Sequence, residues 1–390
     1  MKKRVALLRG NSLNPYEMQS YAPLLPEWDL VGVTTWDNQF AAENIPVPVH
    51  RVHAYTELMK LLPRALRKYP DFALRQLLEL QVPCINLIKH LQHFDIIHTA
   101  DVQYYYSYQA VQAKKRYGNK VIVTQWENIP FALERRRASQ IRNRETITHA
   151  DLFLAITERA KEALLLAGAA EEKIRVLPMG IDMEKFHPAQ RETTLCDKLG
   201  IAATDRVILY AGRLARSKGL VELLCAFARL LKDTDMKTQA LKLLCVGTGD
   251  SEFFSRFSQR LGIAEQVQMI GGISYDHMPA VHNLAEVFVL PSLPTHYWRE
   301  QLGMVLLESM ACGKAVLATL SGSIPEVVGE AGVLVQPYDH FSLYLALRRL
   351  LSDAILREEL GRKARARMET HFDRMQIAAK IAEAYRAVLA

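Results

Sequence analysis

Cysteine is scarce in this sequence, and long apolar runs are absent. The five cysteines are an odd number among 390 residues, widely spaced and set in apolar surroundings. That pattern excludes a disulfide framework or a cysteine-based metal site and predicts reduced core residues in a cytoplasmic protein. No apolar run approaches the ~20 residues that a bilayer-spanning helix needs, so membrane-spanning proteins are excluded as well.

We expect no signal peptide at the start of this sequence, and it contains no low-complexity segment. The opening MKKRVALLRG is better interpreted as a first β-strand, because its apolar run is short and Arg9 interrupts it. The composition, 49% hydrophobic and 23% charged, is typical of a soluble globular protein. The length exceeds one typical core and suits two domains.

The formal net charge of +7 is unevenly distributed. Basic residues gather in two stretches, 60–78 and 114–144. They favour a surface that meets an acidic substrate, an anionic membrane or nucleic acid, although solvated helix faces have the same composition. Nucleic acid is the weakest of these options, because the aromatic residues do not interleave with the basic ones as a stacking platform requires.

Short apolar runs alternate with helical patterns in two successive series. Continuous apolar strands separated by helices indicate parallel sheets covered on both faces, so we expect an α/β protein with two doubly wound domains. The charged, proline-containing stretch 183–199 separates the series, and 373–390 is amphipathic and helical. The predicted strands are 4–9, 30–36, 95–100, 120–126, 152–157 and 174–180, then 206–212, 241–247, 266–272, 286–292, 315–319 and 332–337.

The stretch 291–319 places two glutamates around a glycine, between two apolar strands. Glu300 lies in the predicted loop, Gly303 starts the helix and Glu308 falls more than a turn inside it. The C-terminal edge of a parallel sheet is where open α/β folds bind ligands, and a helix start favours anions. A sugar joined to a nucleoside diphosphate suits this layout; the alternative is an ordinary βαβ unit with two solvated glutamates.

Three glycine-containing turns follow other strands of the second series. GRLARSKG carries Arg213 and Lys218, which suit a diphosphate unless they are simply surface charges. In VGTGD, Gly247 would let the backbone approach a ligand, although the turn is not a full G-x-G-x-x-G. In MIGGIS, Ile273 could supply an apolar wall and backbone groups for a nucleobase.

Taken together, GRLARSKG, VGTGD, the Glu300-x7-Glu308 block and GSIPEVVGEAGVLVQP resemble the nucleotide-sugar domain of retaining GT-B glycosyltransferases, family four. Residues 176–188 are similar to that family's interdomain segment. The resemblance implies two Rossmann-like domains facing across a cleft. Residues 1–190 would form the acceptor-binding domain and 191–372 the nucleotide-sugar domain, with the helix 373–390 packing back onto the first.

The resemblance also implies roles for individual residues. Arg213 and Lys218 would hold the donor diphosphate, Glu308 the ribose hydroxyls and Glu300 the transferred sugar. The backbone at Leu302, Gly303 and Met304 would line the sugar and phosphates. The whole predicted donor site comprises Gly10, Asn11, Arg213, Lys218, Gly247, Ile273, Glu300, Leu302, Gly303, Met304 and Glu308.

The first series departs from the family's pattern at two places. Only Gly10, followed by Asn11, stands where the family has a glycine-rich turn that touches the donor phosphates. DIIHTAD resembles the family's His-x-His strand, with His98 at the first position and alanine at the second. His98 is therefore a catalytic candidate that contacts sugar or acceptor, or else a satisfied strand-end histidine; Asp101 or Glu127 could instead meet the acceptor hydroxyl.

The predicted reaction moves a hexosyl unit from a nucleoside-diphosphate sugar to an acceptor hydroxyl, with retention. Arg213 and Lys218 would stabilise the leaving diphosphate without a metal, and resemblance implies that the leaving phosphate helps to deprotonate the acceptor. No Asp-x-Asp element stands beside a strand end, and the pairs His50/His53 and His90/His93 lack a third metal ligand. We expect no cofactor, and the choice between UDP and GDP stays open.

Other functions remain compatible with the residues. A two-domain protein that binds an anionic sugar without chemistry is one alternative, and a GT-B sugar phosphorylase or sugar-phosphate synthase is another. An acid–nucleophile pair for glycoside hydrolysis is less favoured, because cations and glycine turns surround the two glutamates. The acceptor would be a sugar or a lipid-linked sugar, with peripheral contact to the anionic inner face of a membrane as one option.

Overall fold

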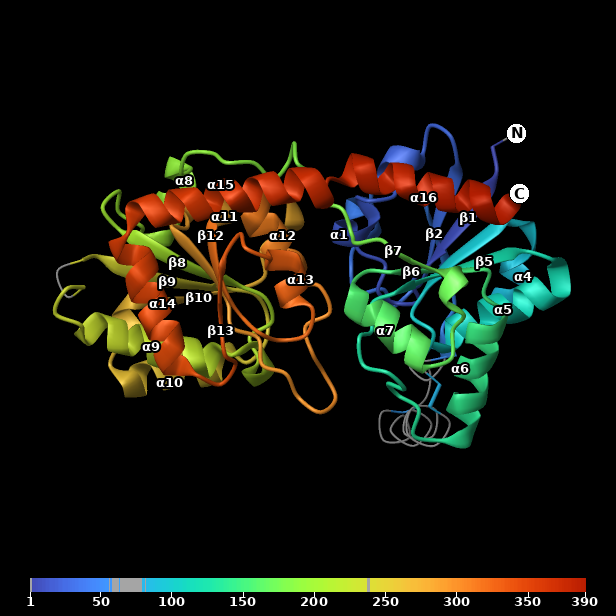
Figure 1. The fold of residues 1–390 in the computed structure, drawn as a ribbon, viewed down its shortest axis with the longest axis horizontal. Coiled ribbons are helices and arrows are strands. Elements are labelled where there is room, and N and C mark those ends of the chain that lie inside the picture. Colours follow the sequence, from blue (N-terminus) through green and yellow to red (C-terminus); the bar gives the residue numbers. More distant parts are fainter. Residues whose placement is uncertain (1, 56, 58–62, 64–78, 81, 237–238) are drawn as a thin grey trace. The chain divides into compact units, whose positions relative to one another are not determined.

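The computed structural model divides the chain into two compact units, Met1–Gly180 with Arg374–Ala390, and Ile181–Asp373. It describes residues 2–55, 57, 63, 79–80, 82–236 and 239–390. The basic stretch 60–78 lies outside the described residues except for Pro63. Each unit is an α/β domain built on its own parallel sheet (Figure 1).

Unit 1 is built on a seven-stranded parallel sheet of order β3-β2-β1-β4-β5-β6-β7. Every residue of β4 and β6 is buried, as expected for strands covered on both faces. The strands are β1 Arg4–Leu8, β2 Asp29–Thr35, β3 Val49–Val52, β4 Ile96–Ala100, β5 Lys120–Gln125, β6 Leu152–Ala155 and β7 Ile174–Val176. The α-helices include α1 Pro15–Met18, α4 Leu87–His90, α5 Tyr105–Tyr117, α6 Arg137–His149, α7 Glu158–Leu166 and α16 Arg374–Leu389.

Helix α16 belongs to unit 1 although nearly two hundred residues of unit 2 precede it in the chain. Its residues Ile377, Ile381 and Tyr385 are buried in the same core as Val5 and Ile96 of the central strands. Figure 1 draws this red helix beside the blue N-terminal elements. Unit 1 is therefore discontinuous in sequence.

Unit 2 is built on a six-stranded parallel sheet of order β10-β9-β8-β11-β12-β13. Strands β8 and β11, at its centre, are almost wholly buried. The strands are β8 Arg206–Ala211, β9 Leu241–Val246, β10 Val267–Ile270, β11 Val287–Leu290, β12 Ala315–Thr319 and β13 Val333–Val335. The helices are α8 Thr193–Leu199, α9 Leu220–Lys232, α10 Ser251–Leu261, α11 Met278–Leu284, α12 Met304–Ala311, α13 Ile324–Val328, α14 His340–Ser352 and α15 Ala354–His371.

The predicted α/β class with two parallel sheets is confirmed, and each of the twelve predicted strands is present. The sequence missed strand β3 at the edge of the first sheet, where His50 and Arg51 are exposed. Its sequence, VHRV, has no continuous apolar run, which an edge strand can lack because it needs only partial burial.

The structure confirms most of the predictions drawn from the scarce cysteines and the missing long apolar runs. All five cysteines are free, and Cys84, Cys245 and Cys312 are buried. The prediction of core positions is wrong for Cys196 and Cys225, which are only partly buried. Among the described residues, no helix is both long enough and apolar enough to cross a membrane.

Candidate functional site

The turns after β8 and β9 in unit 2 are packed so closely that only glycine fits between them. A Cβ on Gly247 would lie 1.9 Å from the carbonyl oxygen of Gly212, and both residues have positive φ. The Leu214 N–H donates to the Thr248 carbonyl at 2.8 Å. These contacts join the two turns into one surface at the C-terminal edge of the sheet.

The same loop is also held against the end of β11. A Cβ on Gly219 would lie 1.8 Å from the carbonyl oxygen of Pro291, and the Leu293 N–H donates to Ser217 at 2.8 Å. Gly322, after β12, approaches the Glu300 backbone just as closely, because a Cβ on Gly322 would lie 2.0 Å from the carbonyl oxygen of Glu300. Four strand ends thus converge through backbone contacts that exclude side chains.

Lys218 and Glu300 meet at this convergence. The Lys218 Nζ lies 2.7 Å from Oε2 of Glu300, and Ser292 Oγ donates to the same oxygen at 2.6 Å. The Lys218 ammonium also lies 4.3 Å from the centre of the Trp298 ring. Because only 12% and 10% of the two charged side chains are exposed, the pair is largely shielded from water and fixed in orientation.

Arg213 differs from Lys218 in being exposed to solvent at the end of β8. The Tyr210 hydroxyl donates to its carbonyl at 2.6 Å and fixes the backbone there. The loop 212–219 therefore carries one shielded cation, Lys218, and two exposed cations, Arg213 and Arg216. An anion entering from solvent would meet the arginine fork first.

Helix α12 begins next to Glu300 without a side-chain cap. Gly303 occupies the N-cap position in the left-handed region, and no side chain accepts from the first turn. Leu302 is buried, while Met304, the first helical residue, is partly exposed. Uncapped first-turn N–H groups attract anions, so this helix start is compatible with the predicted backbone contacts at 302–304, which stay a prediction.

Glu308 lies in the middle of α12 and is only 4% exposed. Its Oε2 lies 3.0 Å from Nε2 of His282, a fully buried residue of α11. Within the described part of the chain, the other ring nitrogen of His282 has no hydrogen-bond partner. Glu308, which is predicted to bind the ribose, therefore has a buried histidine partner that sequence reasoning did not identify.

The loop after β10 borders a hollow of about 530 Å³. Gly272 in this loop packs against Thr248, whose side chain would lie 3.2 Å from an added Cβ, so the loop adjoins the β9 turn. Ile273, the predicted nucleobase wall, is one of the lining residues. The full lining comprises Glu192, Thr194, Leu195, Lys198, Leu199, Ile270, Gly271, Gly272, Ile273, Ser274, His277, Ala280 and Val281.

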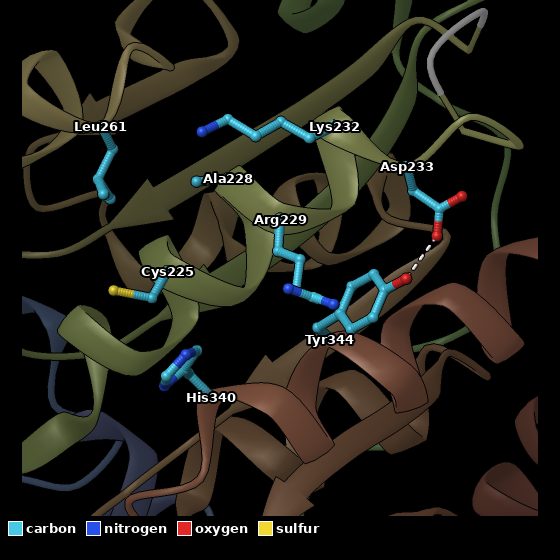
Figure 2. A pocket seen from close by; sticks show the side chains of 8 residues that line it. All are labelled: Cys225, Ala228, Arg229, Lys232, Asp233, Leu261, His340 and Tyr344. Atoms are coloured by element: carbon cyan, nitrogen blue, oxygen red, sulfur yellow. Dashed lines mark hydrogen bonds between the residues drawn. The ribbon is translucent and has the colours of Figure 1, made fainter.

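Figure 2 shows a second hollow in unit 2, of about 440 Å³, between helices α9 and α14. Arg229 and Lys232 line it from α9 and His340 from α14, while Tyr344 donates to Asp233 at 2.5 Å. This hollow involves none of the predicted site residues. Arg348 binds Asp233 at 3.0 Å and also pairs with Asp235, so this Asp-x-Asp element is neutralised by arginine.

Potential metal ligands do not cluster among the described residues, where no group of three or more His, Cys, Asp or Glu side chains could hold an ion. The rings of His50 and His90 lie 5.4 Å apart, and His53 bonds Glu57 at 2.9 Å.

In unit 1, the turn after β1 is mainly structural. Gly10 has a positive φ, is buried, and faces Tyr106, whose ring would lie 2.6 Å from an added Cβ. Its carbonyl accepts from the Thr34 hydroxyl at 2.7 Å. Asn11 is partly exposed and is the member of this pair that a ligand could reach.

His98 lies in a buried polar network that crosses unit 1. Its Nδ1 lies 2.8 Å from the Tyr385 hydroxyl of α16, and its Nε2 lies 2.7 Å from Thr124 Oγ1. The ring is fully buried, and burial holds its pKa well below the usual range. We therefore assign His98 to the interior network rather than to a substrate contact.

The network continues to an ion pair that sequence reasoning missed. Arg9 and Glu17, 2% and 3% exposed, lie 2.7 Å apart, and Arg9 also donates to the His98 carbonyl at 2.8 Å. The arginine that interrupts the first apolar run was the available signal. A charged residue at the end of a buried strand requires a buried partner.

Part of the basic stretch 114–144 is paired within unit 1. Lys114 lies 2.7 Å from Asp151, and Lys115 pairs with Glu145. These pairs reduce the positive charge that the C-terminal end of α5 presents to a partner.

Two family models match the chain: "Glycosyl transferases group 1" over residues 192–367 and "Glycosyl transferase 4-like domain" over residues 26–180. A D-inositol 3-phosphate glycosyltransferase of Corynebacterium jeikeium is 31% identical over 235 residues, covering 58% of this chain and 55% of the relative. The chain spans about half the length of the first curated relatives that it matches.

Solved structures agree in fold. The Anabaena HepE protein, solved in complex with UDP, has a TM-score of 0.76 at 19% identity, covering 99% of this chain and 100% of that one. A sucrose-phosphate synthase of Thermosynechococcus elongatus has a TM-score of 0.74 at 20% identity, covering 100% and 99%. With one family model on each unit and the GT-B fold throughout, the chain belongs to the group 1 glycosyltransferases.

Proposed function

We propose that the chain transfers a hexosyl unit from a nucleoside-diphosphate sugar to an acceptor hydroxyl, with retention at the anomeric carbon. The observation that carries the proposal is the convergence of strand ends in unit 2, where Lys218, Glu300 and Ser292 share hydrogen bonds. The curated relative named for glycosyl transfer to an inositol phosphate supports the reaction class. The UDP complex of the Anabaena protein supports a UDP-sugar as the first donor to test.

Arg213, Lys218 and the start of α12 would act on the leaving group. As the bond between anomeric carbon and phosphate oxygen breaks, the diphosphate gains negative charge, which fixed cations and N–H groups stabilise. The bond from the acceptor oxygen to the anomeric carbon forms on the same face. The hydroxyl proton passes to the departing phosphate oxygen, so the step needs no protein base and no metal.

Two glutamates would orient the donor. Glu300 would accept hydrogen bonds from the sugar hydroxyls while its other contacts hold Lys218 in place. Glu308, fixed by His282, would accept from the ribose hydroxyls. Gly247 and the backbone at 302–304 would approach the phosphates, and Ile273 would pack against the base.

The test compares Lys218→Ala and Glu300→Gln with a matched control, Lys232→Ala. The Lys232 side chain is exposed and makes no hydrogen bond or ion pair with the described residues, so its loss removes a charge without breaking such a contact. We expect both site variants to lose at least 100-fold in release of UDP from UDP-glucose or of GDP from GDP-mannose, with the control near wild type. Full activity in both site variants would contradict the proposal.

Nucleotide binding without any release separates a receptor from an enzyme. UDP and GDP at about 100 times their dissociation constant should each stabilise the folded chain by ~2.7 kcal/mol if bound. Thermal shifts by one diphosphate, together with slow hydrolysis of its sugar, support the transferase and identify the base. Tight binding of the intact nucleotide sugar without hydrolysis or transfer would favour a non-catalytic binding protein.

A further inference from the structure

Asp101 has an unusual backbone at the C-terminal edge of the sheet in unit 1. It directly follows β4 and has φ of +55°, a left-handed conformation that most side chains avoid. The turn is fixed, because its N–H donates to the Thr124 carbonyl at 2.8 Å. Held left-handed residues occur preferentially at binding sites, where the surrounding structure maintains them.

The Asp101 carboxyl group is anchored through one oxygen only. Oδ1 accepts the N–H of Trp126 at 2.7 Å and that of Glu127 at 3.0 Å, both in the loop after β5. Within the described part of the chain, Oδ2 takes part in no hydrogen bond and no ion pair involves Asp101. Asp101 is only 5% exposed. The anchored carboxyl group therefore holds its second oxygen in a fixed direction.

Among the described residues, the charged groups that shift the pKa of this carboxyl are acidic. Burial, helped by the charges of Glu127 and Glu17, raises the pKa of Asp101 to about 7 although the backbone N–H groups of Glu127 and Trp126 act to lower it. Tyr104 has its own pKa raised by burial and by Asp101 and Glu127, while Glu17 is neutralised by Arg9. Such surroundings repel an anionic group but accept a hydrogen bond from a neutral hydroxyl.

His98 lies on β4, three residues before Asp101, and is not available to contact a substrate. Both of its ring nitrogens are engaged in the interior, whereas Asp101 stands at the strand end, where parallel α/β sheets bind ligands. The loops that carry Gly10, Asp101 and Glu127 follow β1, β4 and β5, which are neighbours in the sheet.

We propose that Asp101 is a specificity-determining residue of unit 1 whose Oδ2 accepts a hydrogen bond from a hydroxyl of the acceptor, and that the acceptor presents neutral polyol hydroxyls at this point, not a phosphate or carboxylate. The proposal rests on the proposed function. Asp101 orients the hydroxyl and takes no proton from it, because the proton of the reacting hydroxyl leaves with the diphosphate.

The decisive variant is Asp101→Asn. Asparagine keeps an oxygen for the two backbone N–H groups and replaces the second oxygen by an N–H donor. It therefore preserves the anchor, removes the proposed acceptor atom and no longer titrates. Asp95→Asn, before the other end of the same strand, is the matched control, since Asp95 bonds Lys3 and the Arg4 backbone. The probes are glucose, mannose and myo-inositol, with glucose 6-phosphate and inositol 3-phosphate as charged counterparts.

The readout is release of nucleoside diphosphate with and without acceptor. In the wild type we expect neutral polyols to stimulate release more than their phosphates. Asp101→Asn should raise the acceptor KM at least tenfold and narrow that preference, with acceptor-independent hydrolysis and the nucleotide thermal shift unchanged. The control should match the wild type.

The outcomes separate this proposal from the one beneath it. Intact donor hydrolysis with an unchanged acceptor KM in Asp101→Asn would overturn the role of Asp101 alone. A wild-type preference for the phosphorylated acceptors would overturn the neutral-acceptor class. Absence of both hydrolysis and nucleotide binding in the wild type would overturn the donor assignment and this proposal together.

Discussion

Single residues at the end of β4 show how burial acts oppositely on acids and bases. Burial raises the pKa of Asp101 to about 7 and holds that of His98 well below its usual range. In both cases the uncharged form is favoured, because low-polarity surroundings penalise charge. Both shifts therefore connect folding stability to pH, with opposite signs.

The raised pKa of Asp101 predicts how its stability contribution varies with pH. The folded state holds the proton up to about pH 7 and the unfolded state only to about pH 4. Stability is thus lost as pH rises between these values, and Asp101→Asn should become more stable than the wild type by ~1–4 kcal/mol at pH 8. Urea unfolding of both proteins at pH 4, 6 and 8 checks this.

His98 does not confound that comparison, since both proteins contain it. Its lowered pKa acts in the other direction, so its contribution is lost as pH falls below about 6.5. A stability difference between Asp101→Asn and wild type that stays constant from pH 4 to pH 8 would contradict the assigned environment of Asp101.

At the scale of elements, the strand ends of unit 2 can pack together only where glycine lets two stretches of backbone come into close contact. Gly219 and Gly262 have the same φ of +73°, yet a Cβ would meet the Pro291 carbonyl at 1.8 Å in the first case and nothing within 4 Å in the second. Alanine at either position is strained by its backbone angle, roughly 1–2 kcal/mol. Only at Gly219 does a clash add to that strain.

We therefore predict that Gly219→Ala destabilises the chain by ~2 kcal/mol or more beyond Gly262→Ala. Because the clash pushes the loop 212–219 away from β11, it should also weaken UDP or GDP binding at least tenfold. Thermal unfolding and titration calorimetry of the two variants measure both effects. Equal stability and equal affinity in the pair would show that the close approach is not required.

The sequence was sufficient for elements and insufficient for pairs of side chains. Continuous apolar runs identified the buried strands, and the glycines marked the turns on which Lys218 and Glu300 lie. The partners Ser292, Trp298 and His282 were not identified, because side-chain contacts carry no periodic signal. Ser292 and Trp298 lie in the same loop as Glu300, and His282 lies in the separate helix α11. Likewise, nothing local to DIIHTAD indicated that Tyr385, 287 residues away, would occupy a ring nitrogen of His98.

At the scale of the whole molecule, helix α16 completes the core of unit 1. Ile377, Ile381 and Tyr385 are at most 1% exposed there. Fully burying side chains of this size contributes ~1.5–3 kcal/mol each, which is comparable with the net stability of a domain.

Ending the chain after Asp373 should therefore unfold unit 1 while leaving unit 2, whose residues are continuous, able to bind nucleotide. Calorimetry would then show a single transition with a smaller unfolding enthalpy than that of the full chain, and UDP or GDP would still raise the midpoint temperature of this transition. Tyr385→Phe is the milder companion, since leaving a His98 ring nitrogen without its partner costs ~1–3 kcal/mol. An undiminished unfolding enthalpy in the truncated chain would contradict the role of α16.

The discontinuity of unit 1 also fixes an order of events during synthesis. Residues 374–390 are translated after every residue of unit 2. Until they are made, part of the apolar surface of the sheet in unit 1 stays uncovered. Unit 2 can form its core while translation continues, and unit 1 can close only once α16 has emerged from the exit tunnel. The half of the protein that is made first is therefore the half that finishes folding last, and until then its uncovered apolar surface is prone to aggregation.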